Sequence, residues 1–183
     1  MSGKKTSSIT FRIDEKYDKI LRKLAEEKRV SLNTLANQIF GNFTEFDFYT
    51  RKFGTLLMSN DTFRRILSVI PEKDLILTAS NCGSEEAKEF ILFKWKELNL
   101  SNVLDFIRMY FDYCGYGRCD IETTESKYKI SVHHDFGAKG STFLKHFLEG
   151  LIMSALNKTC KTITTKDSVS LKLFLISLLR TST

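Results

Sequence analysis

The sequence predicts an α+β protein with a small N-terminal module, residues 1–44, and a larger domain, residues 45–183. Residues 8–13 alternate between polar and apolar side chains, and two helical apolar patterns follow them. Helical spacing dominates residues 45–117. Residues 118–176 contain two pairs of alternating segments around one long helical pattern. Paired alternating segments separated by turn residues predict an antiparallel sheet.

The composition is that of a folded chain with a basic N-terminal end. Hydrophobic residues make up 42% and charged residues 27%. Residues 1–43 hold nine Lys/Arg and five Asp/Glu, so they carry +4 of the formal net charge of +6. Such an excess suits an anionic partner. We find no secretory signal, no bilayer-spanning apolar run and too few cysteines for a disulfide scaffold, so we expect a cytoplasmic protein with no membrane partner.

The first expected element is a strand over residues 8–13. One face holds the apolar side chains of Ile9, Phe11 and Ile13, and the other holds Ser8, Thr10 and Arg12. Asp14 can cap a helix that ends near Arg29, and Ser31 can cap a second helix that continues to Phe43. A unit of about 40 residues without cysteines or metal ligands needs a partner to bury its apolar faces. We therefore predict an intertwined homodimer in which two strands pair antiparallel and four helices cover one face.

The two-stranded ribbon of such a dimer fits the major groove of B-DNA. The pattern resembles the ribbon-helix-helix family, which includes the Arc and MetJ repressors. Residues 9–14, the helix to Arg29 and residues 30–35 carry the resemblance, over about a quarter of the chain. It implies base contacts from Ser8, Thr10 and Arg12. It also implies phosphate contacts from Ser31, Leu32, Asn33 and a flexible arm with Lys4 and Lys5.

Other interpretations of the N-terminal module stay open. The strand and helices can belong to the larger fold, form a dimer without affinity for DNA, or bind DNA for a purpose other than regulation. A protein-interaction module, such as an antitoxin or a scaffold, can use the same dimer. A stoichiometric partner protein that copurifies with the chain would favour this last interpretation.

Residues 45–117 are predicted to be mainly helical. A helix follows Asp61 and ends at Pro71. Residues 72–80 fit either a strand or a helix. The segment Asn81–Ser84 is typical of a turn before the next helix, and Ser101 can cap a further one.

The rest of the chain predicts the sheet. The expected elements are a hairpin of residues 118–124 and 127–134 about Glu125 and Ser126, a helix from Lys139 to Asn157, and strands near 159–165 and 169–176. His133 and His134 are neighbours in a strand, so they point to opposite faces. His134 shares the apolar face, which favours a hydrogen-bonded core histidine over a ligand.

The segment His134-Asp135-Phe136-Gly137, followed by Ser141 in a long helix and then a hairpin, resembles 4-vinyl-reductase and haem-NO-binding-like domains. The resemblance implies a sensor or dimerisation role. Only Cys160 falls where those domains have their cysteine pattern. Cys114, Cys119 and His134 are candidate ligands for zinc, copper or iron. The competing interpretation is that the cysteines are buried apolar residues.

These patterns together predict a transcriptional regulator. It would bind double-stranded DNA at a palindromic operator as a homodimer or tetramer. Its C-terminal domain would assemble the oligomer and sense a small-molecule effector, a metal effector or the redox state. No nucleophile motif, P-loop or dinucleotide fingerprint occurs, so we expect no enzymatic activity. An enzyme of the small-molecule-binding type would need a pocket that gathers His134, Asp135 and a cysteine.

Overall fold

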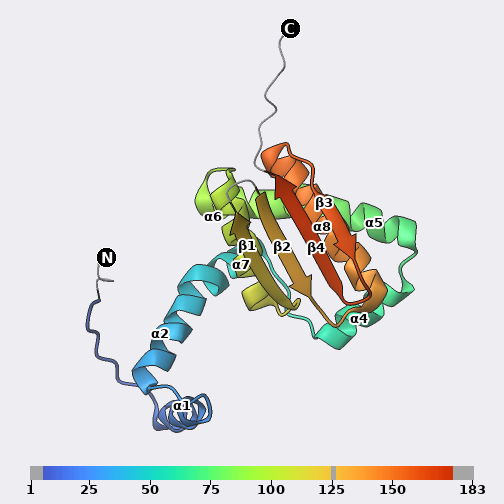
Figure 1. Cartoon of the computed structure of the whole chain (residues 1–183). Helices are drawn as coiled ribbons and strands as arrows, with labels where there is room; N and C mark the ends of the chain where they lie inside the picture. Colours follow the sequence, from blue (N-terminus) through green and yellow to red (C-terminus); the bar gives the residue numbers. More distant parts are fainter. Residues whose placement is uncertain (1–5, 125–126, 175–183) are drawn as a thin grey trace. The chain divides into compact units, whose positions relative to one another are not determined.

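The computed structural model describes residues 6–124 and 127–174 and divides into two compact units, Met1–Phe48 and Tyr49–Thr183. Helices and one four-stranded antiparallel sheet make up the fold, which confirms the predicted α+β class (Figure 1). The predictions for Lys4 and Lys5, for the turn at Glu125 and Ser126, and for residues 175–176 lie outside the described residues.

The N-terminal unit contains the two helices that the apolar spacing predicts. Helix α1 spans Glu15–Glu27 and helix α2 spans Leu32–Asn42, which continues into a π-helical turn η1, Phe43–Asp47. Asp14 occupies the N-cap position of α1 without a side-chain capping bond. Arg29 has a φ of 54°, in the left-handed region, where the chain turns between the two helices.

The predicted strand over residues 8–13 is absent from the single chain. Residues 6–14 form neither helix nor strand, and all of them are exposed. A strand exists only through backbone hydrogen bonds to a neighbouring strand. The described part of this chain offers residues 6–14 no such neighbour, because all four strands belong to the C-terminal unit.

The chain continues into the C-terminal unit with a run of helices. These are α3 (Phe48–Phe53), α4 (Asn60–Val69), α5 (Glu72–Asn81), η2 (Cys82–Ala87), α6 (Lys88–Trp95) and α7 (Leu100–Cys114). Two predicted caps are wrong by two residues. Ser59 caps α4, because its side chain accepts from the Thr62 N–H at 3.2 Å, and Asn99 caps α7 through the Asn102 N–H at 2.9 Å.

The predicted turn at Asn81–Ser84 is also wrong, because α5, η2 and α6 follow one another without a break. This stretch packs on α8, Gly137–Leu156. Gly83 lies so close to α8 that a Cβ there would be 2.0 Å from the Phe147 carbonyl oxygen. The glycine therefore serves a close helix approach instead of a chain reversal.

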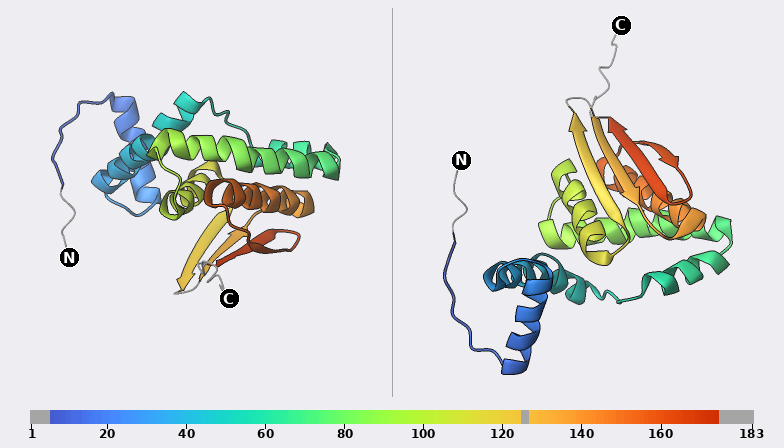
Figure 2. Two further views of the ribbon diagram at one scale, coloured as in Figure 1. Left: turned by 90° about the horizontal axis from the view of Figure 1, so that it is seen from above. Right: turned by 60° about the horizontal axis from the view of Figure 1, so that its bottom comes forward.

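The sheet has the strand order β1-β2-β4-β3, with β1 (Arg118–Thr124) and β3 (Lys161–Thr164) at its edges. Strands β2 (Lys127–His133) and β4 (Ser168–Phe174) pair in the centre. The described helices of this unit lie on one side of the sheet (Figures 1 and 2). The inward side chains of the central strands are fully buried, namely Ile130, Val132, Val169, Leu171 and Leu173.

Candidate nucleic-acid interface

The side chains predicted to contact bases, those of Ser8, Thr10 and Arg12, are exposed in the single chain. Arg12 forms no ion pair with a described residue. The neighbouring cations pair locally, as in Lys16–Asp14 at 3.7 Å, Lys19–Glu15 at 2.7 Å, Arg22–Asp18 at 2.8 Å and Lys23–Glu27 at 3.9 Å. The guanidinium of Arg12 is thus available to an acceptor outside the chain.

The apolar side of the same segment is uncovered. Ile9 is 70% exposed, Phe11 57% and Ile13 51%. The centroids of the Phe11 and Phe40 rings lie 5.4 Å apart, so this segment contacts α2 through an aromatic pair. Exposed large side chains also lie on both helices and at the start of η1, namely Tyr17, Ile20, Ile39, Phe40 and Phe43. The unit therefore presents a broad apolar surface that a single copy leaves in water.

Ser31, Leu32 and Asn33, the predicted phosphate contacts, begin helix α2. The Ser31 side chain is the predicted N-cap, because its hydroxyl accepts from the Thr34 N–H at 3.0 Å. The N–H groups of the first turn have no acceptor within a helix, so those of Leu32 and Asn33 point out of its N-terminal end. With the positive end of the helix dipole, they form a geometry that accepts an anion.

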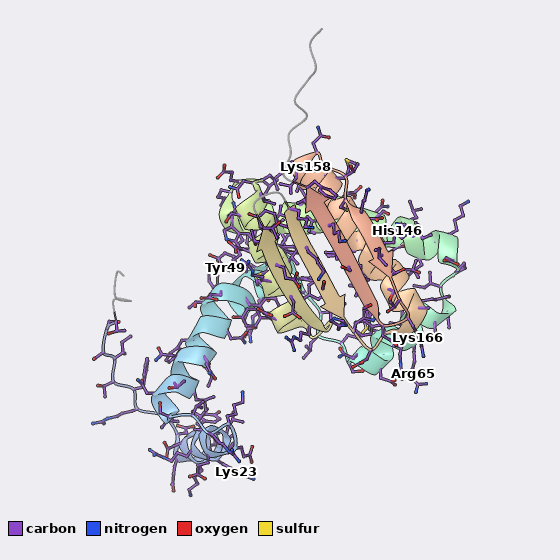
Figure 3. All side chains as sticks on the ribbon, in the orientation of Figure 1. Lys23, Tyr49, Arg65, His146, Lys158 and Lys166 are labelled. Carbon is purple, nitrogen blue, oxygen red and sulfur yellow. The ribbon has the colours of Figure 1, made fainter. Side chains whose placement is uncertain are left out.

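In the C-terminal unit, the structure assigns His134 a role in the fold. The His134 side chain is 4% exposed, its Nδ1 accepts from the Phe136 N–H at 3.2 Å, and its Nε2 lies 2.9 Å from the Ser141 hydroxyl. An accepting Nδ1 places the proton on Nε2, which then donates to Ser141. Ser141 in turn donates to the Lys166 carbonyl at 3.1 Å. We call this chain of hydrogen bonds the histidine pin; Figure 3 labels Lys166 at the turn between β3 and β4.

Burial lowers the pKa of His134, so the imidazole in the histidine pin is held neutral. Gly140 makes room for the pin, because a Cβ there would lie 2.2 Å from the Phe136 Cβ. The prediction of a hydrogen-bonded core histidine is confirmed. Both ring nitrogens of His134 form hydrogen bonds in the histidine pin, so His134, Phe136 and Ser141 have a structural role in packing and hydrogen bonding.

The cysteines do not meet His134 in a metal site. Within residues 6–124 and 127–174, no group of three or more His, Cys, Asp or Glu side chains is placed to hold a metal ion. Burial raises the pKa of Cys114 and of Cys119 to about 12. Both are free, half-buried thiols that stay protonated at neutral pH, whereas a metal ligand or a nucleophile must be a thiolate.

The sheet brings together lysines that are far apart in the sequence. Lys129 of β2 lies opposite Lys172 of β4, which lies opposite Lys161 of β3. Lys127 lies two residues from Lys129 on the same face. We call Lys127, Lys129, Lys161 and Lys172 the outer lysine patch. Alternation in the sequence places Lys127 and Lys129 on one face, but only the pairing of β2 with β4 adds the other two.

A comparison with protein-family models finds no match for this chain, and a comparison with curated proteins finds none either. Among the described residues, no helix combines the length and the apolar character needed to cross a membrane.

Proposed function

We propose that this protein is a sequence-specific DNA-binding transcriptional regulator that acts as a homodimer. Residues 8–13 of two copies would pair as an antiparallel ribbon, which buries Ile9, Phe11 and Ile13 against the helices. The opposite face would then present Thr10 and Arg12, with Ser8, to base edges in the major groove. The N-terminal end of α2 would bind the DNA phosphate at Ser31, Leu32 and Asn33.

The observation that carries this proposal is the exposed apolar face of residues 9–13 beside two helices with exposed apolar side chains. Exposed large side chains on one strand-length segment and two short helices cost free energy until a second surface covers them. A second copy supplies a matching surface by two-fold symmetry. The C-terminal unit, which has its own buried core, would then hold the two copies in a fixed oligomer.

A selection from random DNA duplexes with the purified full chain tests the proposal. We expect one palindromic sequence to be enriched, and Arg12→Ala to abolish binding to it while the dimer persists in sedimentation. Arg12 can donate two hydrogen bonds to a guanine, a contact worth about 1–3 kcal/mol of discrimination. Lys23→Ala, which removes a cation that pairs within α1, is the matched control and should keep the sequence preference.

Two outcomes would contradict the proposal. If no sequence is enriched, the chain does not read DNA sequence. If a second protein copurifies in a fixed ratio and the chain alone is monomeric, the apolar surface serves a different partner, as in an antitoxin or a scaffold.

A further inference from the structure

The outer face of the sheet carries more cations than it can pair. Its two acidic side chains are already engaged: Arg118 Nε lies 3.2 Å from an Asp120 oxygen, and Lys129 Nζ lies 3.1 Å from a Glu122 oxygen. The remaining lysines, Lys127, Lys161 and Lys172, form no ion pair with a described residue. Among the described residues, this face therefore keeps three positive charges without an acidic partner.

The register places these charges close together. Neighbouring strands lie about 4.8 Å apart, so the row from Lys129, which is paired with Glu122, through Lys172, which has no described acidic partner, to Lys161 covers about 10 Å. Like charges directly opposite one another destabilise a sheet. No described segment of the C-terminal unit covers this face, and its helices lie on the other side (Figure 2). An anionic partner would remove the repulsion that the fold leaves here.

We propose that the outer lysine patch binds the sugar-phosphate backbone of double-stranded DNA, as a second contact in addition to that of the N-terminal ribbon. This inference rests on the proposed DNA-binding function and adds a surface to it. A duplex presents one negative charge per about 1.7 Å of its axis, so a patch of about 10 Å meets several phosphates. Lysines that point out of a flat sheet neutralise phosphates without reading bases, so this contact is independent of sequence.

The test compares full-length chains on a random-sequence DNA duplex of about 30 base pairs, by fluorescence anisotropy from about 50 to about 200 mM salt. The triple variant Lys127→Gln, Lys161→Gln and Lys172→Gln removes three phosphate contacts for each bound copy. Each contact contributes about 0.9 to the slope of log affinity against log salt, so the slope should fall by about 2.7. Over this fourfold range of salt, the native chain should lose about 40-fold more affinity than the variant.

Two matched variants separate this contact from general charge and from misfolding. Lys73→Gln, Lys88→Gln and Lys145→Gln remove the same charge from helices α5, α6 and α8 and should keep the native slope. The three patch lysines replaced by arginine should also keep it, because arginine retains the charge. An equal loss of slope in the helix control, or an unchanged slope in the patch variant, overturns the proposal.

Two further measurements distinguish the possible failures. Arg12→Ala should lose the selected operator yet keep the salt-dependent binding to random duplexes. If no operator exists but the patch slope is found, the regulator proposal fails and the patch proposal stands. Vesicles that contain anionic lipid are the third probe. A patch variant that loses vesicle binding and keeps DNA binding assigns the patch to a membrane surface and overturns the DNA proposal.

Discussion

Gly83→Ala is expected to destabilise the C-terminal unit, although alanine is normally the better helix residue. In an isolated helix the change stabilises by about 1 kcal/mol. Here the added Cβ would lie 2.0 Å from the Phe147 carbonyl oxygen and 2.9 Å from the Leu151 nitrogen. Both atoms are backbone, so no rotamer change relieves the contact, and α8 must move away from η2.

The magnitude follows from these two opposing terms. Overpacking costs about 1–3 kcal/mol, and contact with rigid backbone belongs at the upper end. After subtraction of the helix preference, the free energy of unfolding should fall by about 2 kcal/mol. For an m-value of about 2 kcal/mol/M, the urea midpoint falls by about 1 M.

The fluorescence of Trp95 gives the assay, because it is the single tryptophan and lies at the end of α6 in this unit. Gly41→Ala in α2 is the matched control: it is also a helical glycine, and a Cβ there meets nothing within 4 Å. It should leave the Trp95 transition unchanged. A Gly83→Ala midpoint equal to or above that of the native chain would refute the close approach of η2 to α8.

Two further predictions concern titrating groups. Burial lowers the pKa of His134 below its ordinary value of 6.5. The neutral His134 therefore contributes its full stability above pH 6.5. This contribution is lost as the pH falls below 6.5, because the unfolded chain then binds a proton that the folded chain does not. The urea midpoint followed by Trp95 fluorescence should fall less steeply below pH 6.5 in His134→Gln than in the native chain. The control His133→Gln should keep the native pH dependence of this midpoint. A native midpoint that does not change below pH 6.5 would contradict the prediction. Cys114 and Cys119, with pKa values of about 12, should react slowly with iodoacetamide at about pH 8, since their thiolate fraction is about a thousandfold below that of an ordinary thiol. Mass spectrometry of native and urea-unfolded protein checks this, and equally fast labelling of both forms would disprove it.

Local patterns predicted the C-terminal sheet well. The hairpin of residues 118–124 and 127–134 and the helix after it match β1, β2 and α8 closely, because alternation and helical spacing lie within each segment. The burial of His134 also followed from alternation. The caps were harder, since Ser59 and Asp61 both suit an N-cap and only the geometry of the first turn distinguishes them.

The remaining differences depend on partners that lie far away in the sequence. The sequence around Gly83 predicts a turn, because the helix that packs against it, α8, begins more than fifty residues later. The predicted strand over residues 8–13 is not formed, and the described part of the chain offers it no neighbouring strand. The sequence analysis did not identify the outer lysine patch for the same reason. Lys129 and Lys172 become neighbours only because β2 pairs with β4, a strand much later in the sequence.

The edges of the sheet have a consequence for how the protein behaves at high concentration. An edge strand exposes unpaired backbone groups that can recruit another chain and start aggregation. Here β3 is four residues long and carries Lys161, while β1 carries Arg118, Asp120 and Glu122. Short strands and edge charges both discourage added strands. We therefore expect this sheet not to extend by edge-to-edge strand pairing with another copy at high concentration.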